Sequence, residues 1–223
     1  MRLETYADRD MMVIDVANAI ADDLIAALQH SDRVLLAVAG GTTPAPIFDD
    51  LCAADLDWAR VDVVATDERW VPEAHPRSNA RMIKERLLVN RAAAATLIPL
   101  YRDSEAPENI MGDLENALTL RLPIDVALLG MGADMHTASL FPASEGLEEA
   151  LDPKAPILVP VRSASQPEPR ITLSARVLND SLAKHIVITG PEKRAALTAA
   201  GNLSAHQAPI RAVWDGAIVH WAE

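Results

Sequence analysis

Residues 34–44 read VLLAVAGGTTP, an apolar run that ends in two glycines, two threonines and a proline. Five apolar residues without polar alternation are typical of a strand covered on both faces, as in a parallel sheet. Comparable, mostly apolar runs recur at 61–65, 124–129 and 185–189. The stretch therefore predicts the first of several parallel strands.

Helical patterns lie between and after these runs. Apolar residues from Val13 to Leu28 follow the three-four spacing of one helix face, and Asp8 or Asp10 can cap its start. Further helices are expected at about 45–53, 79–88, 107–120 and 191–200. Alternating strands and helices indicate right-handed crossovers. We therefore expect an α/β fold, a three-layer αβα sandwich with a mainly parallel, Rossmann-like sheet. The proline-rich stretch 153–169 is expected to be an irregular surface excursion, so that residues 1–223 form one domain.

Composition excludes several classes of protein. The 223 residues carry 20 Lys and Arg against 32 Asp and Glu, a net charge of −12, which argues against binding to nucleic acid or to an anionic membrane surface. The single Cys52 cannot form an internal disulfide, and no apolar run approaches the ~18 residues of a membrane span. The first residues lack the basic and apolar regions of a secretory signal. We expect a soluble cytoplasmic protein.

The turns that follow the predicted strands carry the chemistry. In such folds, ligands bind outside the carboxyl ends of the strands. The four turns contain glycines, cations or titratable groups, and they read AGGTTP (39–44), TDERWVP (66–72), GMGADMHT (130–137) and GPEKR (190–194). This coincidence predicts one ligand site at the edge where the turns meet.

Two of these turns are rich in glycine. Gly40, Gly41 and Thr42 either let an anion approach the following helix N-terminus or simply form a tight turn; spacing alone leaves both interpretations open. The Gly130-x-Gly132 pair lacks the third glycine of a dinucleotide fingerprint, so no nucleotide cofactor is expected.

Three cations are candidates for binding an anionic ligand. Arg69 follows Asp67 at a strand end, where a guanidinium can grip phosphate oxygens or merely belong to a solvated ion-pair cluster. Lys193 lies in a first helical turn, where the helix dipole disfavours a cation unless an anion is bound. Arg170 opens the apolar run 171–173, and simple solvation is its plainer interpretation.

His136 is the candidate general base, because imidazole titrates near neutrality and can take a proton from water. Asp134 stands two positions before it. A loop histidine is also often only a surface residue. The other histidines show no metal-binding spacing, and no GxSxG motif supports Ser139 as a nucleophile.

Taken together, five segments resemble the 6-phosphogluconolactonase family over most of the chain. They are AVAGGTTP (37–44), TDERWVPEAHPRSNARMIKERLL (66–88), IDVALLGMGADMHTASLFP (124–142), RITLSARVLNDS (170–181) and VITGPEKRAAL (187–197). The resemblance implies hydrolysis of 6-phosphoglucono-1,5-lactone to 6-phosphogluconate in the oxidative pentose phosphate pathway, without metal or cofactor. It also implies the fold shared with glucosamine-6-phosphate deaminases and ribose-5-phosphate isomerases.

The resemblance also implies roles for residues. His136 resembles the family's general base, and from its proximity in the sequence Asp134 is expected to orient the imidazole. Arg69 and Lys193 resemble the phosphate-binding cations, and Arg170 is a possible helper. Gly40, Gly41, Thr42 and Asp67 would line the sugar-phosphate site. One departure is Met135, where the family usually has glycine; a positive φ there would strain methionine.

Two alternatives stay open at this point. A glucosamine-6-phosphate deaminase typically has a Glu in the segment after the histidine and a Tyr after Asp-Glu. In this chain residues 137–142 contain no Glu, and the residue after Asp67-Glu68 is Arg69. A non-catalytic sugar-phosphate sensor would keep the pocket without turnover. The expected partner is a small-molecule sugar-phosphate lactone, and the chain is expected to be a monomer or a homodimer.

Overall fold

The computed structural model describes all residues from 1 to 223, and its strands form two sheets. Every neighbouring pair in the larger sheet is parallel. In spatial order its strands are β1 (Arg2–Thr5), β10 (Ile218–Ala222), β9 (Ala183–Thr189), β6 (Val126–Gly130), β2 (Val34–Val38), β3 (Val61–Ala65) and β5 (Thr96–Ile98). The smaller, antiparallel sheet runs β4 (Asp67–Arg69), β8 (Arg170–Leu173) and β7 (Leu158–Val161).

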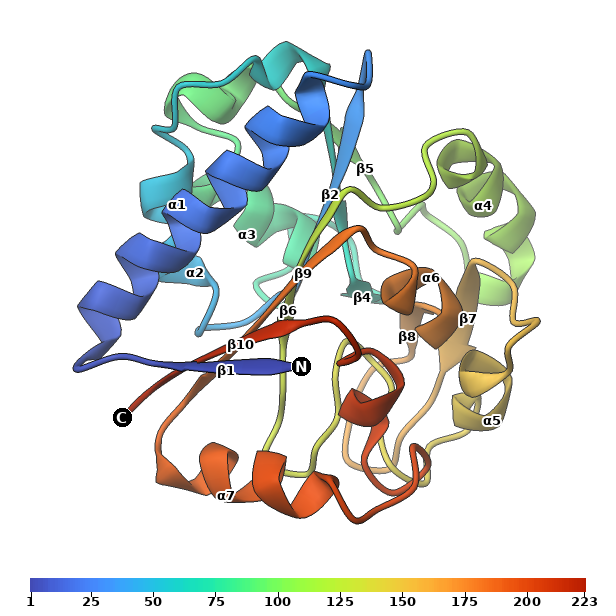
Figure 1. Cartoon of the computed structure of the whole chain (residues 1–223). Coiled ribbons are helices and arrows are strands. Elements are labelled where there is room, and N and C mark those ends of the chain that lie inside the picture. The colour runs from blue at the N-terminus through green and yellow to red at the C-terminus, as the bar shows by residue number, and fades with distance from the viewer.

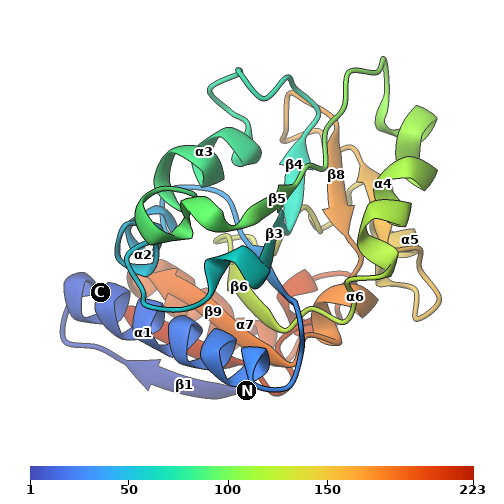
Figure 2. The same ribbon diagram turned by 90° about the horizontal axis from the view of Figure 1, so that it is seen from above.

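Helices flank the larger sheet, with α1 and α2 on one side and α7 on the other (Figure 1). Viewed from above, α4, α5 and α6 lie near the smaller sheet (Figure 2). The helices are α1 (Arg9–Leu28), α2 (Ala45–Leu51), α3 (Asn79–Arg86), α4 (Met111–Thr119), α5 (Leu147–Leu151), α6 (Ala175–Asn179) and α7 (Pro191–Ala200). Four 3₁₀ turns join them, at Trp58–Arg60, Asn90–Ala94, Pro107–Ile110 and Pro209–Ala212. The predicted α/β sandwich with a central parallel sheet is confirmed.

Helix α1 forms where the apolar spacing predicts it. Asp8 is its N-cap, and its carboxylate accepts a hydrogen bond from the Met11 N–H at 2.8 Å. The face that α1 turns toward the sheet is buried from Met12 to Leu28. The helix is therefore held by an apolar stripe and a capped start, both of which are visible in the sequence.

The strand register brings the predicted turns together. In β2, Val38 lies beside Ala65 of β3 on one side and Leu128 of β6 on the other. Gly130 at the end of β6 lies beside Val187 of β9. All four strands point the same way, so the turns after them open at one edge of the sheet.

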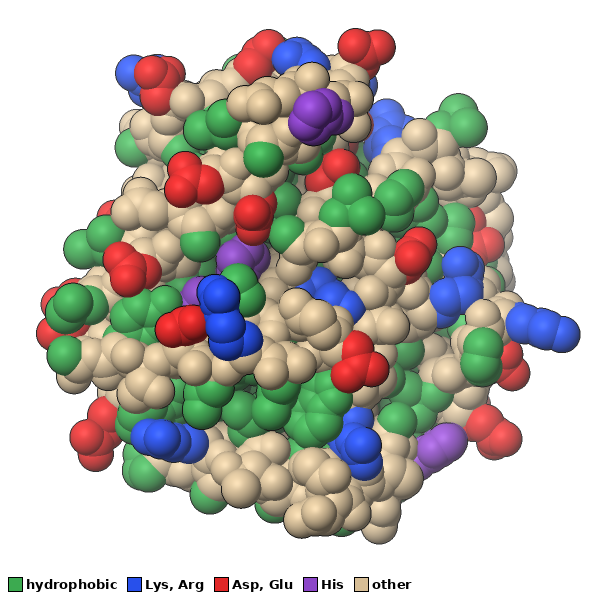
Figure 3. All heavy atoms as spheres, in the orientation of Figure 1, with side chains coloured by type: hydrophobic (Ala, Val, Ile, Leu, Met, Phe, Trp, Pro, Cys, Tyr) green, Lys and Arg blue, Asp and Glu red, His purple; other side chains and the backbone are tan.

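One hydrophobic cluster of 60 buried residues runs through both sheets, so they share a core. The chain passes from β3 into β4 through Thr66, whose carbonyl accepts a hydrogen bond from the Leu173 N–H at 2.9 Å. On the face shown in Figure 3, acidic and basic side chains are interspersed with apolar ones. No helix combines the length and the apolar character that a membrane crossing needs.

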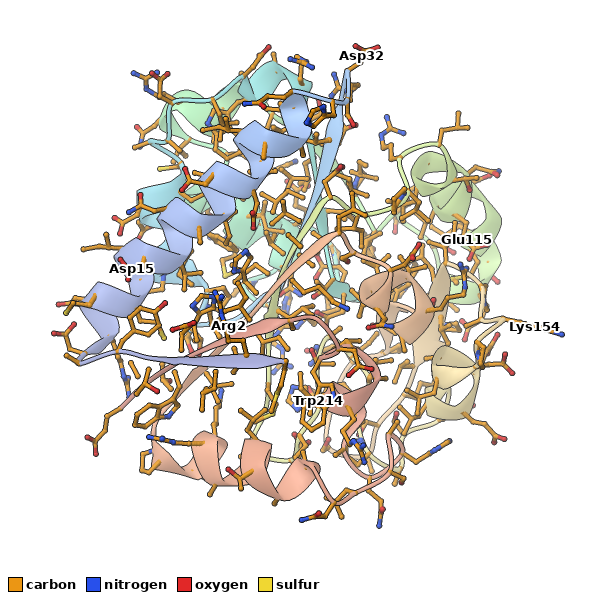
Figure 4. The ribbon with its side chains drawn as sticks, viewed as in Figure 1. Arg2, Asp15, Asp32, Glu115, Lys154 and Trp214 are labelled. Atoms are coloured by element: carbon orange, nitrogen blue, oxygen red, sulfur yellow. The ribbon has the colours of Figure 1, made fainter.

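The structure corrects several sequence-based expectations. The stretch 153–169 is not wholly irregular, because it contains β7, whose Leu158 and Val159 are fully buried. Only parts of the stretch match the prediction, such as Lys154, which extends into solvent (Figure 4). Residues 67–69, expected as a turn, form β4. The helix expected from 107 starts as a 3₁₀ turn, and the short strands β1, β5, β7, β8 and β10 were not predicted.

Candidate active site

A cavity of about 320 Å³ opens at the carboxyl ends of the parallel strands. Its walls come from the turns after β2, β3, β6 and β9, together with β8 of the smaller sheet. Eight of the nine predicted site residues line it, namely Gly40, Gly41, Thr42, Asp67, Arg69, His136, Arg170 and Lys193. The ninth, Asp134, touches the imidazole of His136.

The carboxylate of Asp134 holds the imidazole of His136 in place. Nδ1 of His136 lies 2.5 Å from Oδ1 of Asp134, and the same oxygen accepts the His136 backbone N–H at 3.2 Å. One face of the ring packs on Phe141, with the ring centroids 4.6 Å apart. The hydrogen bond from His136 lowers the pKa of Asp134, so this carboxylate is ionised at neutral pH.

This contact decides which ring nitrogen is available for chemistry. An ionised carboxylate accepts a hydrogen bond from Nδ1–H, which leaves the lone pair of the neutral ring on Nε2. The side chain of His136 is 31% exposed, so water or a ligand in the cavity can reach it. The pair has the arrangement that a general base requires.

The loop around this pair has two special backbone positions. A Cβ on Gly132 would stand 2.2 Å from Nδ1 of His136 and 2.6 Å from Oδ1 of Asp134, so only glycine fits there. Met135 has a φ of 67°, in the left-handed region that favours glycine. The strain anticipated for methionine at this position is therefore present.

Asp67 and Arg170 form a buried pair across β4 and β8. Oδ2 of Asp67 accepts the Ser139 hydroxyl at 2.6 Å and lies 3.5 Å from Nη1 of Arg170. Arg170 is only 4% exposed, so the plainer expectation of a solvated side chain is wrong. Burial lowers its pKa, and repulsion from Arg69 adds to that effect. Since the Ser139 hydroxyl faces Asp67, it is not aimed at His136 as a nucleophile would be.

The Asp67-Glu68-Arg69 triplet is not a solvated ion-pair cluster. Glu68 is buried, and its carboxylate accepts the backbone N–H groups of Arg69, Asn79 and Ala80 at 2.7–2.8 Å. It thereby ties β4 to the start of α3, where the dipole favours an anion. Burial is the main reason why the pKa of Glu68 is raised.

Arg69 is the cation of the triplet that remains accessible. It is partly exposed, and its Nη1 donates to the carbonyl of Arg77 at 2.6 Å. No carboxylate lies within ion-pair distance of its guanidinium. Its charge is thus available to an anion in the cavity.

Lys193 reaches the cavity from the first turn of α7. It makes no hydrogen bond or ion pair within the protein, and burial lowers its pKa. In the turn between β2 and α2, none of the four backbone N–H groups from Gly40 to Thr43 donates a hydrogen bond within the protein. An anion is the ligand that such unpaired donors and cations suit best.

Sequence reasoning missed several residues that line or shape the cavity. Asn79 donates to the carbonyl of Asp67 at 2.7 Å, and its amide stands where a Cβ on Gly40 would lie. Phe141 and Gln166 also line the cavity. The only available signal was the Ser78–Asn79 helix start, because the cavity forms only where turns from different parts of the chain come together. No group of three His, Cys, Asp or Glu side chains is placed to hold a metal ion.

Comparison with known proteins gives consistent matches. Residues 7–221 match the family described as glucosamine-6-phosphate isomerases/6-phosphogluconolactonase. A 6-phosphogluconolactonase of Mesorhizobium japonicum is 41% identical over 214 residues, covering 95% of this chain and 90% of the relative. Another from Pseudomonas aeruginosa is 39% identical over 210 residues, covering 92% and 88%. The crystal structure of a 6-phosphogluconolactonase from Shewanella baltica OS155 matches with a TM-score of 0.96 and 31% identity, covering 100% of this chain and 98% of the other.

Proposed function

The chain belongs to the glucosamine-6-phosphate isomerase/6-phosphogluconolactonase family, and we propose that its cavity hydrolyses 6-phospho-D-glucono-1,5-lactone to 6-phospho-D-gluconate. It is a lactonase by its similarity to relatives of that name. The observation that carries the proposal is the His136–Asp134 pair, which shares one cavity with three cations. The reaction is the second step of the oxidative pentose phosphate pathway.

We assign the proton transfers to His136. Nε2 takes a proton from a water molecule, and the water oxygen bonds to the lactone carbonyl carbon C1. The carbonyl oxygen becomes an oxyanion, which the unpaired N–H groups of the 40–43 turn or a neighbouring cation would stabilise. When the oxyanion collapses, the bond from C1 to the ring oxygen breaks, and Nε2 returns its proton to that oxygen. Asp134 holds the ring and stabilises the imidazolium in between.

We assign the phosphate to the cations. Arg69 and Lys193 carry unpaired charge into the cavity, and Arg170 is the helper beside them. Gly40, Gly41 and Thr42 lie at the same wall, beside the sugar ring or the phosphate. Asp67 lines the cavity and anchors Arg170 and Ser139. A phosphate held at these cations would orient the lactone toward His136.

The remaining parts of the proposal concern the whole protein. We propose that residues 1–223 act as one lactonase domain, supported by the single core that runs through both sheets. We further propose that the enzyme works in the cytoplasm, without metal or cofactor, as a monomer or a homodimer. Turnover in the presence of a chelator tests whether a metal is needed, and the mass of the protein in solution tests the oligomeric state.

The direct test generates the lactone in situ with glucose-6-phosphate dehydrogenase and follows 6-phosphogluconate. Added protein should accelerate its appearance over spontaneous ring opening, and His136→Ala should lower kcat by ~100-fold or more, the usual contribution of a general base. His206→Ala, a change at an exposed histidine, is the matched control. Tight product binding without acceleration would instead identify a sensor, and ammonia release from glucosamine 6-phosphate would identify a deaminase.

A further inference from the structure

A second hollow, of about 610 Å³, lies directly beside the proposed active cavity. The two share six lining residues, namely Gly41, Thr42, Arg69, Asn79, Gln166 and Arg170. From there the second hollow continues over α3 and the turn that precedes it. Nothing in the proposed lactonase mechanism uses this extension.

The hollow is lined by an excess of positive charge. Arg69, Arg77, Arg81, Arg86 and Arg170 line it, with Glu85 as the one lining carboxylate. This concentration of arginines is notable in a chain whose net charge is −12. Arg81 and Arg86 are each paired, with Glu85 and Asp49 respectively. Arg77 and Arg170 also have carboxylate partners, Glu168 and Asp67, so the lining arginine left without a carboxylate is Arg69, at the end nearest the active cavity.

Arg69, Arg77 and Arg170 all line the hollow at that end. Arg69 and Arg170 are direct cross-strand partners in β4 and β8, and Nη1 of Arg69 donates to the Arg77 carbonyl at 2.6 Å. Two carboxylates lie within ion-pair distance of this group: Asp67 is 3.5 Å from Arg170, and Glu168 is 3.0 Å from Arg77. Arg69 has no such partner.

These groups lack part of the bonding that a buried arginine normally has. The Nε atoms of Arg69 and Arg170 are buried without a hydrogen-bond partner. Unsatisfied donors and like charges in a partly desolvated place are costly, and a bound anion offsets both costs.

We propose that Arg77, together with Arg69 and Arg170, forms a second anion subsite beside the substrate phosphate. The site then accepts ligands with two linked phosphate groups, one in each hollow. This inference rests on the proposed function only in that such a ligand competes with the lactone phosphate for Arg69 and Arg170. Sugar acids with two phosphates and polyphosphates are the classes of compound that fit.

The test compares inorganic pyrophosphate with orthophosphate. Calorimetry on the wild-type protein should give at least ~10-fold tighter binding for pyrophosphate, and pyrophosphate should inhibit lactone hydrolysis competitively. Arg77→Gln should reduce this preference to ~2-fold while kcat/KM for the lactone stays within ~2-fold of the wild type. Arg91→Gln, which removes an exposed arginine outside both hollows, should leave the preference unchanged and controls for loss of one positive charge.

Two outcomes overturn the proposal: equal affinity for the two anions in the wild type, or an unchanged preference in Arg77→Gln. Repeating the calorimetry on His136→Ala separates this test from the lactonase proposal, because anion binding needs no turnover. A protein that binds pyrophosphate through Arg77 but does not hydrolyse the lactone would refute the proposed function and leave the subsite standing.

Discussion

Among single residues, Gly132 has the most direct consequence for catalysis. Any Cβ at this position would collide with His136 Nδ1 and Asp134 Oδ1, at 2.2 and 2.6 Å. Both side chains would have to move, and a displacement of about 1 Å at a reacting group can cost ~100-fold in rate.

We therefore expect Gly132→Ala to lower kcat by about 100-fold while KM changes little, since the cations that we assign to the phosphate lie elsewhere in the cavity. Steady-state kinetics with the lactone measures both constants. Gly112→Ala is the matched control, because a Cβ at Gly112 meets nothing within 4 Å. A Gly132→Ala protein with the wild-type kcat would show that the position of the imidazole is not critical.

Met135 tests the backbone of the same loop. Its φ of 67° costs an L-residue roughly 1–2 kcal/mol, a cost that glycine escapes. We expect Met135→Gly to have a free energy of unfolding about 1 kcal/mol higher than Met135→Ala, since comparing two truncated side chains removes the lost packing from the comparison. Urea unfolding measures the difference.

In the control, the difference in free energy of unfolding between the glycine and alanine variants should have the opposite sign. At Ala195, an exposed position inside α7, glycine should be less stable than alanine by roughly 0.5–1 kcal/mol. If Met135→Gly were likewise the less stable variant, the left-handed strain at residue 135 would not be a significant part of the stability.

At the scale of elements, four side chains form a hydrogen-bonded series that links α1, β9, β10 and the residue after β1, and its two central histidines, His185 and His220, are buried. Tyr6 Oη lies 2.8 Å from His220 Nδ1, His220 Nε2 lies 3.0 Å from His185 Nδ1, and His185 Nε2 lies 2.8 Å from Asp23 Oδ2. Burial, followed by the neighbouring His185 and Arg2, lowers the pKa of His220 from 6.5 to about 4. Arg2 on β1 and Asp15 on α1 are labelled in Figure 4; burial and then the charge of Asp15 raise the pKa of Tyr6 in this region.

The lowered pKa of His220 in this series of side chains predicts how the free energy of unfolding depends on pH. Between pH 6.5 and about 4, the unfolded state binds a proton at His220 that the folded state does not bind, so the free energy of unfolding falls as the pH is lowered through this range. The total loss is roughly 3 kcal/mol, and above pH 6.5 this group contributes no pH dependence.

We expect His220→Gln to flatten the profile between pH 4 and 6.5, because its side chain does not titrate. Urea unfolding at several pH values measures the profile, and His206→Gln, at an exposed histidine, is the control that should leave it unchanged. An equally steep profile in His220→Gln would assign the acid sensitivity to other groups.

For the molecule as a whole, the proposed ligand bridges two sheets. Arg69 and Arg170 come from the smaller sheet, whereas His136 and Lys193 follow strands of the larger one. A ligand that binds only the folded state stabilises it by about 2.7 kcal/mol at 100 times its Kd. For a chain of this length, that corresponds to a rise in Tm of roughly 5–10 °C.

We therefore expect 6-phosphogluconate to raise the Tm of the wild type by this amount in differential scanning calorimetry. At the same ligand concentration, Lys193→Gln should show a clearly smaller rise, because one charged contact to the phosphate is lost, on the order of 2 kcal/mol. An equal rise in both proteins would remove Lys193 from the phosphate site.

The sequence by itself determined the parallel core and which turns carry the site. Strands such as 34–38 and 61–65 are buried on both faces, so nearly all of their consecutive residues are apolar, with Asp62 as the exception. The turns then share an edge, because parallel strands in one sheet place their carboxyl ends together. The family resemblance added the roles of the residues on those turns.

Only the tertiary structure decided the smaller sheet and what depends on it. Strands β7 and β8 are four residues each, and β4 only three, too short for a clear period. The pairing of β4 with β8 joins segments about a hundred residues apart, as with Arg69 and Arg170. That pairing buries Arg170 beside Arg69 and places it in the wall of the second hollow, neither of which a local pattern can encode, because burial and repulsion between charges depend on neighbours that only the folded chain supplies.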